Sequence, residues 1–155
     1  MRGIIAIAAS ALVMGCVSSS PGEDTRSTGS TSLSDANSGN FAEQTLVSIN
    51  SYRRQHGLRP LQPHQVLYKL AMQHSQNQAA AGRISHNGSD QRRAVARSAG
   101  MEGCGENVGY RHTSPQNVVR HWSNSPGHRR IMLTPDMRYA AVARHGPYVT
   151  FFACR

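Results

Sequence analysis

The chain has 155 residues, enough for one domain with tails but too few for two full domains. Hydrophobic residues make up 38% of it and aromatic residues 6%, which is too lean for a polytopic membrane protein. Lys and Arg outnumber Asp and Glu by 17 to 8, which gives a formal net charge of +9. The sequence has no Gly-X-Y period, no heptad run and no repeat of about 20–50 residues, so collagen, coiled-coil and solenoid folds are excluded.

The first residues have the order of a secretory signal. Arg2 precedes an uncharged, mostly apolar run over residues 4–14, which is too short to cross a hydrocarbon core of about 30 Å. The run ends in Gly15-Cys16, which resembles the bacterial lipoprotein signal, whose cysteine becomes the lipid-carrying N-terminus. We predict a signal peptide over residues 1–15 and lipidation of Cys16 with fatty acids such as palmitate. A plain signal peptide with an incidental cysteine is the alternative.

The stretch after Cys16 is rich in Ser, Thr, Gly, Asp and Asn. Such a stretch buries too little apolar surface to offset the entropy lost on ordering. We predict that residues 16–39 are the lipidated cysteine and a disordered tether, and that residues 40–155 form the folded domain. Val17 resembles the residue found at this position in lipoproteins directed to the outer membrane. The predicted location is therefore the bacterial cell envelope, anchored by lipid to the outer membrane and facing the periplasm.

Two helices are predicted first in the folded region. Asn40 and Glu43 fit a variant of the capping box, and apolar residues at helical spacing continue from there until Gly57. Pro63 can open a second helix at its first turn. The apolar face of that helix fades near Gly82.

Two further helices follow in the sequence. Ser89 is a candidate cap for a third, basic helix that stops at Gly100. Ser114-Pro115 is a cap followed by proline at the first helical position of a fourth helix, and Pro126 ends that helix.

Two short strands close the chain, over residues 139–143 and 148–153, around a His-Gly-Pro turn. Helices followed by strands are typical of an α+β fold, in which helices pack on a small antiparallel sheet.

Three turn-rich segments carry side chains with the chemistry of a site. They are a Ser-His-Asn-Gly turn with His86, a Gly-Glu-Asn-Val run with Glu106, and a Trp-Ser-Asn-Ser-Pro-Gly-His-Arg segment with His128. Each is a weak signal alone, because a lone histidine in a loop is usually solvated or structural.

Together the segments resemble the CAP superfamily (cysteine-rich secretory proteins, antigen 5 and pathogenesis-related 1), also called the SCP domain. The resemblance spans residues 41–155 and keeps the family's order and spacing. It implies an α-β-α sandwich with helices flanking a small antiparallel sheet, and an extracytoplasmic binding or envelope-associated function. The residues that carry it are Asn50, Arg53, Gly57, Leu58, Pro60, Leu61, Leu67, Ala71, Ser85, His86, Gly105, Glu106, Asn107, Trp122, residues 125–129 and the final strands.

The resemblance also implies a central cavity, onto which His86, Glu106 and His128 are carried over. The fourth family position is a glutamate in eukaryotic members and is Ser125 here. Two imidazoles and a carboxylate suit Zn²⁺ or another divalent cation. Glu106 would then be a ligand, or an acceptor behind a ligating histidine.

Two other roles for the cavity are also compatible with the sequence. Without metal, Glu106 would accept hydrogen bonds from the histidines and hold their loops in place. With metal, Glu106 could be the catalytic base of a hydrolase that acts on an envelope ester or amide. Neither His-Glu-x-x-His nor Gly-x-Ser-x-Gly is present, so the sequence does not decide whether the protein is an enzyme.

With Cys16 lipidated, Cys104 and Cys154 remain as an even pair. Disulfides persist in exported proteins, so we predict a Cys104–Cys154 bond. Two buried free thiols are the alternative.

The excess of arginine raises the question of partners. Export and the absence of helix-turn-helix or zinc-finger patterns disfavour nucleic acid. The expected partners are the membrane, through the N-terminal lipid, and anionic lipids or other envelope polyanions. A role of the charge in solubility alone is the alternative, and no oligomeric state is predicted.

Overall fold

The computed structural model describes residues 33–155. The predicted signal peptide, Cys16 and most of the predicted tether lie outside these residues, so the predictions made for them stay predictions. None of the described helices combines the length and the hydropathy needed to cross a membrane.

The centre of the described domain is a four-stranded sheet with the strand order β1-β3-β4-β2. Its strands are β1 (Gln62–Pro63), β2 (Gly105–Tyr110), β3 (Tyr139–His145) and β4 (Tyr148–Cys154). The strands β3 and β4 form an antiparallel hairpin, β2 runs antiparallel to β4, and the short β1 runs parallel to β3. The sheet therefore ends on one side at β2.

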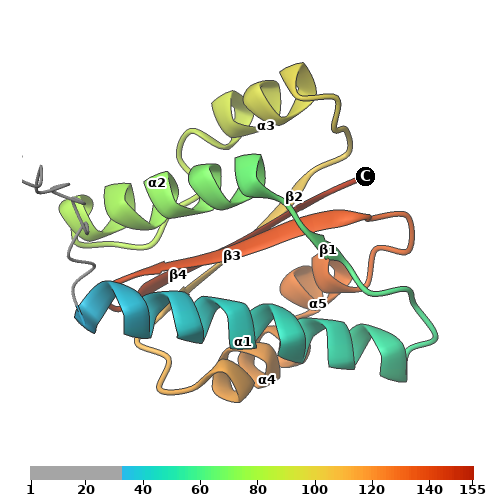
Figure 1. The fold of residues 1–155 in the computed structure, drawn as a ribbon, viewed down its shortest axis with the longest axis horizontal. Coiled ribbons are helices and arrows are strands. Elements are labelled where there is room, and N and C mark those ends of the chain that lie inside the picture. The colour runs from blue at the N-terminus through green and yellow to red at the C-terminus, as the bar shows by residue number, and fades with distance from the viewer. Residues whose placement is uncertain (1–32) are drawn as a thin grey trace, which may run out of the picture. The chain divides into compact units, whose positions relative to one another are not determined.

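Helices cover both faces of this sheet (Figure 1). On one face lie α1 (Leu33–Gln55), α4 (Pro115–Asn124) and α5 (Pro126–Met132). On the other face lie α2 (Gln65–Ala81) and α3 (Ser89–Ser98). The predicted α+β class and the α-β-α sandwich are confirmed.

Alternation along β3 explains why the sheet has two apolar faces. Ala140 and Val142 belong to the larger core, with Trp122 of α4 and residues of α1 and α5. Ala141 and Ala143 belong to the smaller core beneath α2 and α3. Successive side chains of a strand point to opposite faces, so each helical layer packs against its own set of strand residues.

The ends of the first three helices differ from the predictions. The first helix begins at Leu33, so Asn40 lies inside it and its Oδ1 accepts a hydrogen bond from Gln44 Nε2 at 2.8 Å instead of capping the backbone. Pro63 lies in β1, and the second helix begins at Gln65. Ser89 is the first residue of α3 and not its cap. Local capping patterns recur inside helices and turns, so they fix a helix end only weakly.

Predictions for the second half of the chain are closer. The Ser114 cap is confirmed, because its Oγ accepts a hydrogen bond from the Asn117 backbone N–H at 3.1 Å. Pro126 ends α4 as expected, but it also begins α5, a helix that was not predicted. The β3–β4 hairpin is confirmed with slightly longer strands, while the Gly-Glu-Asn segment expected in a turn-rich context is the strand β2.

The predicted disulfide is confirmed. Cys104 and Cys154 are joined, with an S–S distance of 2.05 Å. The bond links the residue that precedes β2 to the last residue of β4.

Candidate functional site

The edge strand β2 holds two separate segments in place through adjacent side chains. Glu106 contacts His86 of the loop after α2, with 2.9 Å between Glu106 Oε1 and His86 Nδ1. The Asn107 side chain donates from Nδ2 to the backbone oxygen of His128 in α5 at 3.0 Å. Adjacent strand residues point to opposite faces, so the Glu-Asn pair braces one histidine segment from each helical layer.

Glu106 is buried and fully engaged. Arg92 of α3 donates from Nε to Glu106 Oε2 at 2.6 Å and from Nη2 to Oε1 at 2.8 Å, which is a bidentate pair. Arg92 Nη1 also donates to the backbone oxygen of Asn87 at 2.9 Å. A carboxylate only accepts hydrogen bonds, so His86 must donate from Nδ1. One guanidinium therefore ties the His86 loop and Glu106 together.

His74 of α2 lies behind this network. It is buried, its Nε2 donates to the backbone oxygen of Ser85 at 2.7 Å, and the same nitrogen lies 3.6 Å from Glu106 Oε1. Burial lowers the pKa of His74, and this outweighs the opposite effect of the Glu106 charge. His74 is therefore neutral at pH 7 and holds the loop from beneath.

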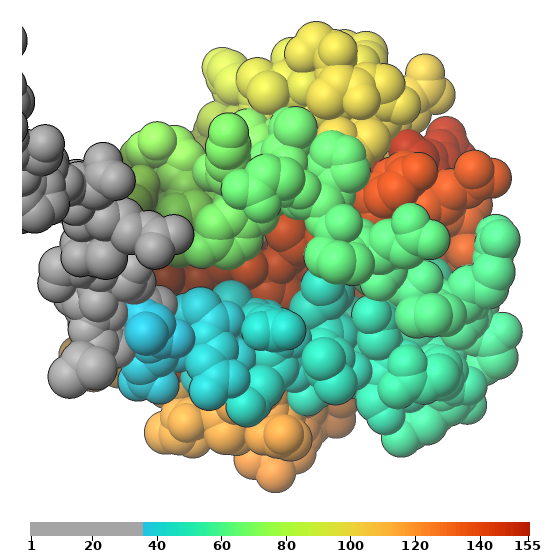
Figure 2. All heavy atoms as spheres, in the orientation of Figure 1, coloured from blue at the N-terminus to red at the C-terminus, as the bar shows by residue number. Residues whose placement is uncertain are grey.

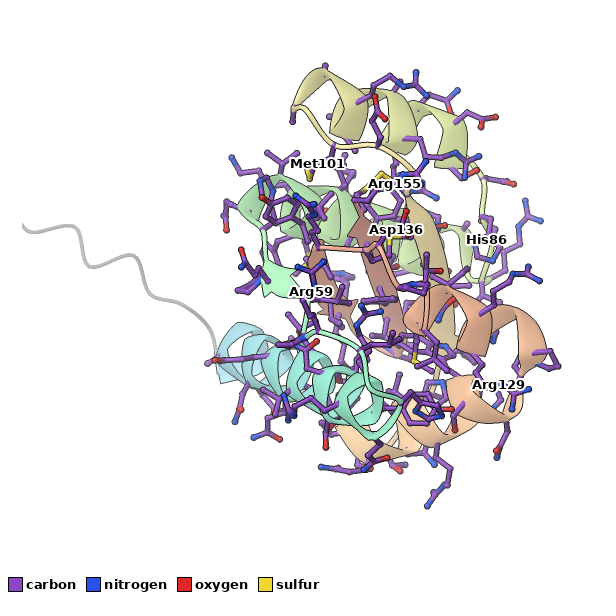
Figure 3. The ribbon with its side chains drawn as sticks, turned by 90° about the vertical axis from the view of Figure 1, so that its right-hand side faces the viewer. Arg59, His86, Met101, Arg129, Asp136 and Arg155 are labelled. Atoms are coloured by element: carbon purple, nitrogen blue, oxygen red, sulfur yellow. A yellow bond between two sulfur atoms is a disulfide. The ribbon has the colours of Figure 1, made fainter. Side chains whose placement is uncertain are left out.

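A hollow of about 560 Å³ lies along the outer edge of β2. Residues from the His86 loop, β2, the loop after β2, α4 and α5 line it, and four histidines are among them, without any Asp or Glu. We call it the histidine pocket. Figure 3 shows His86 and Arg129, the neighbour of His128, on the same side of the molecule. Its lining residues are Ile84, Ser85, His86, Val108, Gly109, Tyr110, His112, Asn117, His121 and His128.

Two of the family-implied site residues thus share the pocket, and two do not. His86 and His128 line it. Glu106 lies behind His86 and contributes no surface to it. Ser125 is the residue between α4 and α5, where its backbone oxygen accepts from the Arg129 N–H at 2.8 Å, and it does not line the pocket either.

Burial also sets the charge of the pocket. Burial lowers the pKa of His128, and the nearby His121 and His86 lower it further because two imidazolium ions repel. Burial likewise lowers the pKa of His112. Both side chains are neutral at pH 7, so each offers a nitrogen lone pair.

Three residues of the site were missed at the sequence level. Arg92 lies in a basic helix, and nothing in that run marks it as the buried arginine. His112 precedes α4, His121 lies in its last turn, and both are outside the family motif. Asn117 and His121 are four residues apart in a predicted helix. This spacing places two polar side chains on one face of α4 and could have indicated His121.

The pocket offers imidazole nitrogens, and no carboxylate, as donors to a cation. Among residues 33–155, no three His, Cys, Asp or Glu side chains are placed to hold one metal ion. His86 uses Nδ1 for Glu106, so Nε2 is its free ligand nitrogen. His128 has a buried Nδ1 without a partner among the described residues. Two imidazoles with water in the other positions are compatible with Zn²⁺.

The chain belongs to the cysteine-rich secretory protein (CAP) family, whose pattern matches residues 46–154. It is 28% identical over 106 residues to the uncharacterized protein YkwD of Bacillus subtilis (strain 168), a match that covers 66% of this chain and 41% of YkwD. It is 30% identical over 112 residues to the uncharacterized membrane protein YlbC of the same strain, covering 70% of this chain and 32% of YlbC. The chain therefore spans less than half the length of these relatives.

A solved structure has the same fold. It is an extracellular protein containing an SCP domain from Bacillus anthracis str. Ames, with a TM-score of 0.71 at 20% sequence identity. The match covers 83% of this chain and 45% of that structure. At this identity the likeness establishes the fold and leaves the function to the site.

Proposed function

We propose that the protein is an extracytoplasmic binding module and that the histidine pocket binds a divalent metal ion such as Zn²⁺ through His86 and His128. The observation that carries the proposal is that Glu106 contacts the ligand histidine from behind and does not line the pocket itself. The carboxylate faces Arg92 and His86, while the open pocket is lined by imidazoles and contains no acid.

Glu106 acts behind the ligand in this proposal. By accepting from His86 Nδ1 it keeps the proton on that nitrogen and leaves the Nε2 lone pair free. A histidine oriented by a carboxylate is a better metal ligand, because the carboxylate fixes the ring and raises its basicity. The metal would supply positive charge and open coordination positions for a further ligand.

Hydrolysis with Glu106 as base has less support. A general base must reach the water that it deprotonates, and Glu106 is buried, lines no part of the pocket and accepts from both Arg92 and His86. Ser125 also lies outside the pocket lining, so its hydroxyl is not placed to act there as a nucleophile. Binding is therefore the function that the geometry favours.

The proposed location is the cell envelope, with the protein tethered through a lipid on Cys16. Two findings support a location outside the cytoplasm. One is the disulfide, and the other is that similar proteins are described as extracellular or as membrane proteins. Cys16→Ser is expected to move the protein from the membrane fraction to the soluble fraction and to abolish labelling by a palmitate analogue. Labelling that persists in this variant would rule out Cys16 as the lipid site.

Anionic lipids or other envelope polyanions are the proposed surface partners, given the net charge of +9. Co-sedimentation of the protein with anionic vesicles should fall as salt is raised from low to physiological concentration. Binding that does not depend on salt would exclude this electrostatic role.

Isothermal titration of the full chain with ZnCl₂ tests the metal site. Replacing both His86 and His128 by Ala is expected to weaken Zn²⁺ binding at least tenfold. His145→Ala is the matched control, because His145 is an exposed histidine at the far end of β3 and outside the pocket. Equal Zn²⁺ affinity of the wild type and the double variant would overturn the proposal.

A further inference from the structure

A second pair of histidines lies in the histidine pocket, apart from His86 and His128. His112 follows β2 in the chain, and His121 lies in the last turn of α4. Their ring centroids are 5.2 Å apart, and the ring planes are tilted by 57°. Neither residue belongs to the motifs that define the family resemblance.

The His112 ring is held in a defined orientation. Its Nδ1 donates to Asn117 Oδ1 at 2.9 Å, which leaves Nε2 as the nitrogen with a free lone pair. The ring also lies over Gly109, where a Cβ atom would come within 2.8 Å of it. A glycine in β2 and an amide on the first turn of α4 thus fix this imidazole, as outer partners fix a ligating histidine.

The spacing of the two rings matches that of two imidazoles on one metal ion. A metal–nitrogen bond is about 2.0–2.1 Å, and the nitrogen lies about 1.1 Å from the ring centroid. Two imidazoles at a tetrahedral angle then have centroids about 5.2 Å apart. The 5.2 Å between the His112 and His121 centroids matches this spacing, so the two rings are close enough to share one cation once their nitrogens turn toward it.

We propose that His112 and His121 form a second metal site, for a divalent transition metal of the class that favours imidazole, such as Cu²⁺, Ni²⁺ or Zn²⁺. His112 Nε2 and one ring nitrogen of His121 are the protein ligands, and water fills the other positions. Burial keeps His112 neutral at pH 7, as metal binding requires. The pair shares the pocket of the proposed His86–His128 site but none of its ligands.

The test uses Cu²⁺, which binds nitrogen ligands most strongly among these ions, and the full chain carrying His86→Asn and His128→Asn. In this background one Cu²⁺ per chain is expected to bind, with an electron paramagnetic resonance spectrum showing coupling to two imidazole nitrogens. Adding His121→Asn should weaken Cu²⁺ binding at least tenfold and reduce the coupling to one nitrogen. His121 is exposed, so this change should leave the circular dichroism spectrum unaltered.

Two controls separate this site from the other one. His145→Asn in the same background should leave the Cu²⁺ affinity within twofold, while His112→Asn should weaken it as His121→Asn does. Unchanged affinity after His121→Asn would overturn the second site. So would loss of Cu²⁺ binding already in the His86→Asn/His128→Asn background, a result that would leave the His86–His128 site standing.

Discussion

A buried carboxylate is stable only when its charge is balanced and its lone pairs are used. Glu106 meets both conditions with two side chains from different segments, Arg92 of α3 and His86 of the loop after α2. Arg92 is buried as well, and it also bonds the backbone of Asn87. The position of His86 at the pocket therefore depends on an arginine that does not line the pocket.

Arg92→Met is expected to lower the free energy of unfolding by about 3–5 kcal/mol, because it leaves the Glu106 charge buried without its main partner. Urea denaturation followed by circular dichroism measures the loss. Arg93→Met is the matched control, since Arg93 contacts Asp90 and the Ser89 hydroxyl at a more exposed position, and it should change stability by no more than about 0.5–1 kcal/mol. Equal losses in the two variants would contradict the role given to Arg92.

The same network predicts the tautomer of His86. Since Glu106 accepts from Nδ1, the neutral ring should carry its proton on Nδ1 and leave Nε2 unprotonated. Nitrogen-15 chemical shifts of the imidazole at pH 8 distinguish the two tautomers. A dominant Nε2–H form of His86 would contradict the contact with Glu106 and would remove the reason for assigning Nε2 as the ligand atom.

At the scale of elements, a helix or strand could be predicted when the residues that determine it lie close together in the sequence. The β3–β4 hairpin could be predicted because its apolar residues and its turn lie close together in sequence. The strand β2 could not, because Gly-Glu-Asn carries no apolar alternation and becomes a strand only by pairing with β4, some 40 residues later. His86 and His128 were found through the family resemblance, whereas Arg92 and His112 gain their meaning only from long-range contacts.

Gly109 illustrates how an element positions the site. A Cβ atom at this residue would lie 2.8 Å from His112 Nε2 and 2.9 Å from Val149 Cγ1, so Gly109→Ala should displace the His112 ring and destabilise the fold by about 1–3 kcal/mol. Gly127→Ala is the control, because a Cβ there meets no atom within 4 Å. Thermal unfolding and the His112 ring resonances report the two effects. An unchanged His112 spectrum in Gly109→Ala would show that the ring is not held by this contact.

For the whole molecule, the disulfide joins the residue before β2 to the last residue of β4 and so holds these two strands together. Cys104 and Cys154 are 50 residues apart, and closing a loop of this length stabilises the folded state by about 3–4 kcal/mol in the chain-entropy description. Replacing both cysteines by Ser should lower the free energy of unfolding by this amount in urea. The wild type under reducing conditions should match the variant, and a reduced protein as stable as the oxidised one would contradict the prediction.

Protonation acts on the whole molecule through one buried and two half-buried histidines. Burial lowers the pKa of His74, His112 and His128 below the ordinary value of 6.5. Well above pH 6.5 these rings are neutral in both the folded and the unfolded chain, so there they do not make stability depend on pH. As the pH falls below 6.5, the unfolded chain takes up protons that the folded chain does not bind, and the free energy of unfolding must decrease.

Urea denaturation at pH 7.5, 6.5 and 5.5 should therefore show falling stability in metal-free buffer. His74 is the informative residue, because Glu106 on β2 opposes the shift while burial, Arg92 on α3 and His86 on the neighbouring loop favour it. His74→Gln keeps a donor for the Ser85 carbonyl but cannot titrate, so its stability should fall less over this range. The exposed His145 supplies the control, since His145→Asn should leave the slope unchanged. A wild-type stability that is flat or rises towards pH 5.5 would mean that these histidines are charged in the folded protein.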